Sequence, residues 1–321
     1  MIKAVFHPFW GAGVNEDILG YPHSWVGDRY AQPLRELKAA AARHGIEMAG
    51  TGFTDYKDAD VFFFWERPRE GDKVFQYALA SGKPMYLLAT EPVSTLPMNG
   101  SPDNIMLFDK IFVWNGKTGH RVFHIKPIYF AFPRELSEKP FASRKLSCMI
   151  ASIYNRENDA DELYSKRAES VRWFEQNHPD GMDFYGRQNR FTDTRFSIYR
   201  GPVDNKLPLM EQYKFIICYE NTCGLHGYIS EKIFDAFFAG CVPVYWGAPD
   251  VSDYIPADCY IDRREFDSYE KLYDRLISMD ENEYTRYRER AASFLTTPFA
   301  RGYDEFALAK TILDKCFNIT M

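Results

Sequence analysis

Residues 213–256, YKFIICYENTCGLHGYISEKIFDAFFAGCVPVYWGAPDVSDYIP, carry the clearest structural signal of this chain. An apolar run at 213–219 ends in the polar pair Glu220-Asn221, and a glycine-containing loop leads to a helix predicted at 230–239. A second apolar run follows at 242–246. Strands that are apolar on both faces and joined by a helix are typical of a buried parallel sheet. The stretch therefore predicts a βαβ unit.

The same alternation extends to both sides of this stretch. The other predicted strands are 2–9, 47–53, 59–65, 84–90, 108–114, 146–153 and 183–186. The other predicted helices are 28–44, 71–81, 161–177, 268–279, 281–295 and 303–317. A stretch with three prolines and mixed charges, 127–145, is the predicted linker. The pattern predicts an α/β protein with one domain at 1–140, a second at 141–300, and a C-terminal helix at 301–321 that could pack back on the first domain.

The composition is that of an ordinary globular protein and excludes several classes. The 321 residues are 45% hydrophobic with a net charge of −6, so neither disorder nor a nucleic-acid partner is expected. We find no apolar run long enough for a transmembrane segment and no signal peptide in MIKAVFHPFW, which predicts a cytoplasmic protein. The six cysteines form no CxxC pair and no zinc pattern, so we expect reduced, buried thiols.

The start of the helix at 230–239 has an unusual charge. Ser230 suits the N-cap position and Glu231 suits the positive end of the helix dipole, but Lys232 does not. A cation in the first turn is unfavourable unless an anion lies nearby. That anion could be a phosphate held by the loop and the helix N-terminus, or it could be the carboxylate of Glu231 or Asp235.

The stretch at 213–256 resembles the donor-binding signature of the α1,3/α1,4-fucosyltransferases that use GDP-fucose. The matching segments are Tyr219-Glu220-Asn221-Thr222, Tyr228-Ile229-Ser230-Glu231-Lys232 and Val242-Pro243-Val244-Tyr245-Trp246-Gly247. A looser match covers the second half of the chain. The resemblance implies a GT-B fold, in which two Rossmann-like domains face each other across a cleft. It also implies that the C-terminal domain binds the donor and the N-terminal domain binds the acceptor.

The resemblance further implies which residues contact GDP-fucose. Lys232 would neutralise the diphosphate, Glu231 would bind sugar or ribose hydroxyls, and Ser152 matches the serine after the first strand of the donor domain. An arginine of the 161–177 helix should reach the diphosphate. We assign Arg167, because Arg172 precedes Trp173-Phe174, which look like core, but an insertion after Ser152 leaves Arg172 open. The full set of expected donor-binding residues is Ser152, Arg167, Asn221, Tyr228, Glu231 and Lys232.

Glu91 is the expected catalytic residue. It ends the apolar run 84–90 and precedes Pro92, in a segment that resembles the family's strand and glutamate ahead of FDKIFVWN at 108–115. The family resemblance implies a general base that takes the acceptor's proton. An ordinary loop carboxylate is the alternative. Glu66 also ends an apolar run, VFFFWE, but no motif of the family matches it.

These features predict an inverting fucosyltransferase that moves L-fucose from GDP-β-L-fucose to a hydroxyl of an N-acetyllactosamine-type or lipopolysaccharide glycan. The linkage would be α1,3 or α1,4 and the reaction a single displacement. The resemblance implies no metal and no cofactor besides the donor substrate, because lysine and arginine would offset the diphosphate charge. The alternatives are a GT-B enzyme with another nucleotide sugar and a non-catalytic two-lobed sugar-binding protein. The acceptor, the regiospecificity and the oligomeric state stay open.

Overall fold

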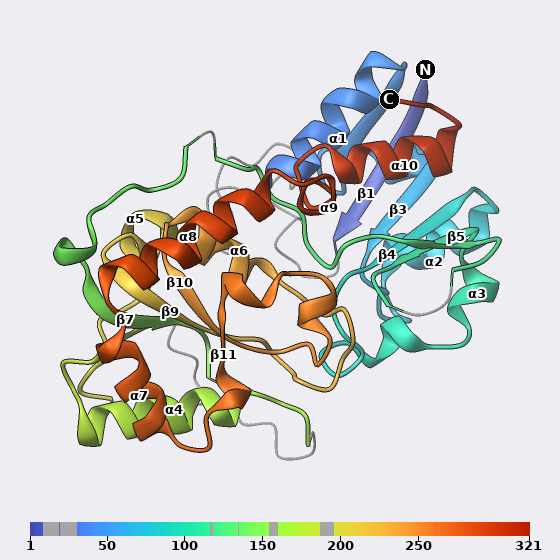
Figure 1. The fold of residues 1–321 in the computed structure, drawn as a ribbon. Helices are drawn as coiled ribbons and strands as arrows, with labels where there is room; N and C mark the ends of the chain where they lie inside the picture. Colours follow the sequence, from blue (N-terminus) through green and yellow to red (C-terminus); the bar gives the residue numbers. More distant parts are fainter. Residues whose placement is uncertain (9–18, 20–30, 116–117, 134, 154–159, 187–195) are drawn as a thin grey trace. The chain divides into compact units, whose positions relative to one another are not determined.

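The computed structural model describes residues 1–8, 19, 31–115, 118–133, 135–153, 160–186 and 196–321. The chain divides into two compact units, which we describe separately (Figure 1). Unit 1 contains Met1–Phe132 and Arg301–Met321, and unit 2 contains Pro133–Ala300. The division falls within the predicted linker, at Phe132, whereas the expected first domain ran to residue 140.

Unit 1 is built on a parallel sheet with the strand order β2-β1-β3-β4-β5-β6. The strands are β1 (Ile2–Pro8), β2 (Ile46–Gly50), β3 (Val61–Trp65), β4 (Met85–Ala89), β5 (Lys110–Val113) and β6 (Val122–His124). The helices are α1 (Gln32–Arg43), α2 (Lys73–Ser81), α3 (Asn104–Leu107) and α10 (Ala307–Phe317). In β3, Phe63 packs into one core cluster while Phe62 and Phe64 pack into another, so both faces of the sheet are covered. This explains the unbroken apolar runs of the sequence.

One residue at each end of α2 explains why the helix begins and ends where it does. Asp72 stands at the N-cap, where its Oδ1 accepts a hydrogen bond of 2.9 Å from the backbone N–H of Phe75. Gly82 ends the helix with φ of 65°, a left-handed conformation in which glycine has no Cβ to strain. The predicted helix end at Gly82 is therefore confirmed.

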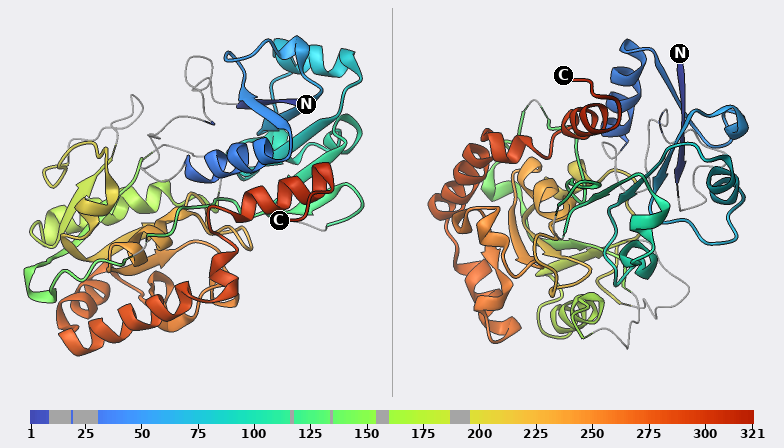
Figure 2. Two further views of the ribbon diagram at one scale, coloured as in Figure 1. Left: turned by 90° about the horizontal axis from the view of Figure 1, so that it is seen from above. Right: turned by 90° about the vertical axis from the view of Figure 1, so that its right-hand side faces the viewer.

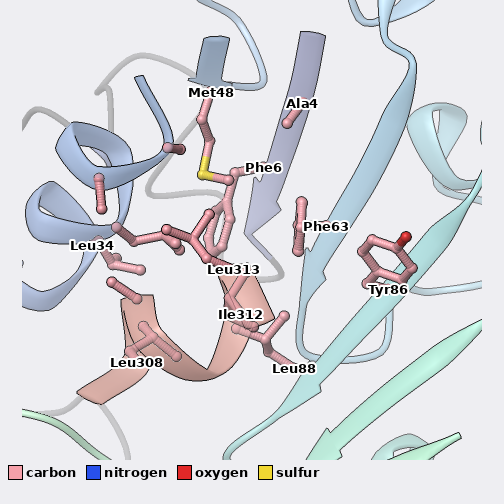
Figure 3. Close-up of a cluster of buried hydrophobic side chains, with 14 of the residues drawn as sticks. Ala4, Phe6, Leu34, Met48, Phe63, Tyr86, Leu88, Leu308, Ile312 and Leu313 are labelled. Carbon is pink, nitrogen blue, oxygen red and sulfur yellow. The ribbon is translucent and has the colours of Figure 1, made fainter. Parts of the chain in front are cut away.

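The last helix of the chain, α10, completes the core of unit 1. Leu308, Ile312 and Leu313 are buried and belong to the same cluster as Phe6 and Phe63 (Figure 3). Figures 1 and 2 show α10 in red beside α1 in blue, so segments from both ends of the chain cover one face of this sheet. Full burial of each leucine or isoleucine side chain contributes roughly 1.5–3 kcal/mol. The C-terminal segment is therefore part of the core of unit 1.

Unit 2 is built on a second parallel sheet, with the strand order β11-β10-β9-β7-β8. Its strands are β7 (Lys145–Ile150), β8 (Met182–Tyr185), β9 (Tyr213–Tyr219), β10 (Val242–Trp246) and β11 (Ile261–Asp262). Its helices are α4 (Tyr164–Asn177), α5 (Lys206–Met210), α6 (Glu231–Phe238), α7 (Tyr269–Ser278), α8 (Glu281–Leu295) and α9 (Pro298–Arg301), the last crossing the boundary between the units. The stretch at 213–256 forms the predicted βαβ unit, with β9 and β10 paired directly.

Some elements differ from the sequence prediction. The helix predicted at 303–317 begins only at Ala307, because the side chain of Asp304 accepts hydrogen bonds from the backbone N–H groups of Phe306 and Ala307. The helix predicted at 28–44 is observed from Gln32, and residues 28–30 lie outside the described part. The short elements β6, α3 and α5 were not predicted. Among the described residues, no helix has the length and apolar character that crossing a membrane requires.

Candidate functional site

The strand order of unit 2 places a topological switch point between β7 and β9. These strands are neighbours in the sheet, but β7 continues to β8 on one side and β9 continues to β10 and β11 on the other. Ligands of open α/β sheets bind at such a switch point, because the two connections leave in opposite directions. Ser152 follows β7 and the pair Glu220-Asn221 follows β9. These predicted residues therefore lie beside the switch point.

Arg167 joins the segments that follow the two strands. Its Nη1 donates to the carbonyl of Ser152 at 3.0 Å, and its Nη2 donates to the carbonyl of Tyr219 at 2.8 Å and to Oδ1 of Asn221 at 3.0 Å. The side chain is only 2% exposed, which rules out the ordinary solvated helix face that its sequence neighbours suggested. Its Nε is buried and has no hydrogen-bond partner among the described residues. Burial also lowers the pKa of the guanidinium below its usual value.

Arg172, the other arginine considered, lies elsewhere on α4. It is exposed, and its guanidinium lies 5.7 Å from the ring centroid of Phe196. It is therefore not the core residue that its neighbours Trp173-Phe174 suggested. Of the two arginines, the structure brings Arg167 to the switch point.

Lys232 finds its anion within the chain. Its Nζ lies 3.2 Å from Oε2 of Glu220 and 2.9 Å from Oγ of Ser230. Glu220 is completely buried and also accepts hydrogen bonds from the backbone N–H and the hydroxyl of Ser230, at 2.8 and 2.6 Å. Ser230 stands at the N-cap of α6 but makes no side-chain capping bond to the helix. The predicted N-cap position of Ser230 is confirmed, but its hydroxyl binds Glu220 instead of a backbone N–H of the helix.

Glu231 lies between two lysines. Its Oε1 is 3.7 Å from Nζ of Lys232 and 3.7 Å from Nζ of Lys206, whose Nζ also binds Asp235 at 2.7 Å. Burial by itself would raise the pKa of Glu231, but the two lysines outweigh it and lower the pKa to about 2. Glu231 is therefore ionised at neutral pH, and the pKa of Lys232 is raised by the neighbouring carboxylates despite burial.

Tyr228 and its loop close one side of this cluster. Asn221 Nδ2 lies 3.4 Å from the hydroxyl of Tyr228, which is 5% exposed. The preceding Gly227 has φ of 72°, and its N–H donates to Asp250 Oδ1 at 2.9 Å. A chain of hydrogen bonds thus links Ser152, Arg167, Asn221 and Tyr228, while Glu231 and Lys232 form a contiguous ionic pair. Asn221 follows Glu220 directly, so the two groups adjoin.

The sequence analysis missed three residues of this cluster: Glu220, Lys206 and Gly247. Glu220 was quoted in the motif but given no role, although a carboxylate directly after a buried strand needs a cation. Lys206 lies outside the motif at 213–256, and the acidic pair Glu231 and Asp235, one helical turn apart, is the signal that could have indicated it. Gly247 is required because a Cβ there would lie 2.4 Å from Glu220 Cγ.

Glu91 lies in unit 1, after β4. Its backbone N–H donates to Oε1 of Glu66 at 3.1 Å, and its carbonyl accepts from Nδ2 of Asn99 at 3.0 Å. The side chain is half-buried. Glu66, the competing candidate, is 1% exposed, and its carboxylate is occupied by donors of the segment 90–99. Glu66 is therefore the less accessible of the two carboxylates.

The described residues contain no group of three histidine, cysteine, aspartate or glutamate side chains that could hold a metal ion. None of the six cysteines, all of which are described, forms a disulfide, and four of them are buried. The positive charges of the cluster in unit 2 are those of Arg167, Lys232 and Lys206. Each of these side chains lies against carboxylate or carbonyl oxygens.

Comparison with known proteins adds an independent finding. The chain is 39% identical over 72 residues to an α-(1,3)-fucosyltransferase of Helicobacter pylori, a match covering 22% of this chain and 15% of that protein. It is 30% identical over 155 residues to the mouse enzyme 4-galactosyl-N-acetylglucosaminide 3-α-L-fucosyltransferase 9, covering 46% of this chain and 38% of the relative. The chain thus spans less than half the length of these curated relatives.

A solved α1,3-fucosyltransferase with GDP-fucose shares the fold. The superposition has a TM-score of 0.53 at 17% identity and covers 90% of this chain and 82% of that protein. The fold class is therefore α/β with two Rossmann-like units, as in GT-B glycosyltransferases. The sequence profile of the C-terminal part of glycosyltransferase family 10 (fucosyltransferase) matches residues 142–310, more than half of the chain. The chain belongs to this fucosyltransferase family.

Proposed function

We propose that this protein transfers L-fucose from GDP-β-L-fucose to a sugar hydroxyl and that the cluster at the switch point of unit 2 binds the donor. The observation that carries the proposal is the buried arginine at this point: Arg167 binds Ser152, Tyr219 and Asn221, and its Nε–H has no hydrogen-bond partner within the part of the chain that the structure describes. Family membership supports a fucosyl donor.

The diphosphate of the donor is assigned to Lys232 and Arg167. Nζ of Lys232 has three protons; its hydrogen bonds to Glu220 and Ser230 use two of them, and the third can bind a phosphate oxygen because Glu231 lies at a longer distance of 3.7 Å. Glu220 fixes this ammonium group at the start of α6, whose N-terminal N–H groups favour a further anion. The ionised carboxylate of Glu231 accepts hydrogen bonds from hydroxyl groups, so we assign it to the sugar or the ribose.

The reaction follows from these assignments as an inverting single displacement. Glu91 takes the proton of the acceptor hydroxyl as its oxygen attacks the anomeric carbon of fucose from the side opposite the leaving group. The bond to GDP breaks, and Lys232 and Arg167 stabilise the negative charge that develops on the diphosphate. A positioned base contributes about 10²–10⁴-fold to such a step. The product is an α-fucoside.

The chemistry that we propose needs no metal ion and no cofactor besides the donor. The diphosphate charge is met by side-chain cations, as in the charge-assisted pairs that arginine and lysine form with phosphate. We propose an N-acetyllactosamine-type or lipopolysaccharide acceptor, by family likeness, and a cytoplasmic location. Six thiols without a disulfide, four of them buried, support a reducing compartment. Cell fractionation checks the location.

A thermal-shift experiment with three nucleotides tests the donor class. A ligand that binds the folded state alone raises the melting temperature, and we expect GDP to do so while UDP and NAD do not. A shift with UDP and none with GDP would indicate a glycosyltransferase with another donor. Binding of free sugars without turnover of any nucleotide sugar would indicate a non-catalytic binding protein.

The base is tested separately with Glu91→Gln, which keeps the shape and removes the proton acceptor. We expect kcat to fall by about two orders of magnitude or more while the affinity for GDP-fucose stays within twofold. Glu47→Gln is the matched control, because Glu47 is an exposed residue of β2 in the same unit. Loss of donor affinity in Glu91→Gln would assign this residue a different role.

A further inference from the structure

Glu66 is one of two described residues other than glycine that have a positive φ, the other being Asn318. It follows β3 with φ of 68°, a left-handed conformation that costs a residue with a Cβ roughly 1–3 kcal/mol. Its backbone N–H donates to the carbonyl of Leu88 in β4 at 2.8 Å, which directs the chain across the carboxyl end of that strand. Such strain persists where surrounding contacts hold it. The hydrogen bonds of the Glu66 side chain therefore indicate what its left-handed backbone conformation achieves.

The carboxylate of Glu66 binds one segment of the chain, residues 90–99. The backbone N–H of Thr90 lies 3.1 Å from both carboxylate oxygens, and the Thr90 hydroxyl donates to Oε1. The N–H of Glu91 donates to Oε1 at 3.1 Å, and Nδ2 of Asn99 donates to Oε2. All of these groups act as donors toward Glu66, so the ionised carboxylate fits them.

Both backbone polar groups of Glu91 are held through this arrangement. Its N–H binds Glu66 directly, and its carbonyl accepts from the same Asn99 amide that binds Glu66. Asn99 is fixed in turn, because its Oδ1 accepts from the backbone N–H of Arg67 at 3.0 Å. Residues 66 and 67 thus hold the segment at both of its ends.

From this geometry we infer that Glu66 is a positioning residue, whose buried carboxylate fixes the backbone of Glu91 and so sets the place of the general base. The inference rests on the proposed function of Glu91. Glu66 acts through Glu91 and touches no substrate. Misplacement of a reacting group by about 1 Å can cost on the order of 10²-fold in rate, so a small shift of this backbone is sufficient to matter.

The charge of Glu66 is part of the arrangement. Burial raises its pKa to about 7, with repulsion from Glu91 adding to the rise and the hydrogen bonds from Thr90 and Asn99 opposing it. The neighbouring cation, Arg67, is engaged by Asn104 at 2.9 Å and Glu70 at 2.6 Å. A proton on Glu66 replaces an acceptor with a donor, and the backbone N–H groups of Thr90 and Glu91 cannot accept it. Above pH 7 the ionised carboxylate therefore offers the segment 90–99 its full set of acceptors, while the buried charge lowers the stability of the fold.

The test compares Glu66→Gln and Asn99→Ala with the exposed control Glu47→Gln. We expect each of the first two variants to lower kcat about tenfold, less than Glu91→Gln, with GDP-fucose affinity unchanged. The double variant should lose less than the product of the single effects, because both act on one network. In the wild type, we expect kcat to rise with pH through a step near pH 7. This step should be absent from the pH profile of Glu66→Gln and present in that of Glu47→Gln.

Amide hydrogen exchange separates this inference from the proposed function. Glu66→Gln should speed exchange at the Thr90 and Glu91 amides, whether or not the protein transfers fucose. If the wild type transfers no fucose, the proposed function is refuted. The exchange result then still shows whether Glu66 holds the segment 90–99. Unchanged exchange, or an unchanged pH step, would overturn the positioning role. An effect of Glu66→Gln on kcat as large as that of Glu91→Gln would overturn it in favour of Glu66 as the base.

Discussion

At the scale of single residues, Glu66 makes stability depend on pH in an unusual direction. A carboxyl whose pKa rises on folding, from 4.5 to about 7, stabilises the fold below pH 4.5 and loses that contribution as pH rises toward 7. We expect the stability of the wild type relative to Glu66→Gln to fall by about 3 kcal/mol over this range. Chemical denaturation of both proteins at pH 4.5 and 8 measures the difference. An equal difference at both pH values would contradict the prediction.

Lys232 is the residue that we propose to bind the diphosphate of the donor. Lys232→Ala removes a charge-assisted contact to the diphosphate, so we expect GDP affinity to fall roughly ten- to a hundredfold. It also leaves Glu220 buried without its cation, which lowers stability, so folding is checked by thermal denaturation. Titration calorimetry measures the affinity.

Lys166→Ala serves as the matched control for Lys232→Ala. Lys166 is a partly exposed residue of α4 in the same unit and pairs only with Glu169 among the described ion pairs. This control should retain the wild-type affinity for GDP. Equal affinity in Lys232→Ala and Lys166→Ala, with both folded, would exclude the N-terminus of α6 from the donor site.

At the scale of elements, the start of α6 depends on the close approach of β10. A Cβ on Gly247 would lie 2.4 Å from Glu220 Cγ and 2.4 Å from the hydroxyl of Tyr245. Gly247→Ala should therefore displace Glu220, cost about 1–3 kcal/mol and weaken GDP binding through Lys232. Gly71→Ala is the control, because a Cβ there meets nothing within 4 Å and φ is not positive. Thermal denaturation and calorimetry of both variants check this, and wild-type behaviour of Gly247→Ala would contradict it.

The elements also show what the sequence can reveal. Long apolar runs such as β3 and β9 and capped helices such as α2 were predicted, because their signals are local. The short α5 was not, since its five residues carry too little periodicity. The donor-site residues could be named from a motif, whereas the burial of Arg167 and the pairing of Lys232 with Glu220 could not. Those depend on segments far apart in the sequence, such as Ser152 and Asn221 around Arg167.

At the scale of the whole molecule, the chain returns to unit 1 to complete its core. Leu313 of α10 is fully buried against residues of α1 and the sheet (Figure 3). Leu313→Ala should lower stability by about 2–5 kcal/mol. Because the change lies in unit 1, GDP affinity in unit 2 should persist at temperatures where the protein stays folded. Denaturation measures the loss of stability, and amide hydrogen exchange shows which residues lose protection. A loss of protection confined to residues 133–300 would contradict the assignment of α10 to the core of unit 1.

The measurement that tests the account most directly is analysis of the product formed from GDP-β-L-fucose and N-acetyllactosamine in excess EDTA. We predict a fucosylated product whose new linkage is α by nuclear magnetic resonance, formed at the same rate with and without EDTA. The rate should fall by about two orders of magnitude or more in Glu91→Gln. A β-linked product, a requirement for added manganese or magnesium, or transfer from a nucleotide sugar other than GDP-fucose would contradict the account.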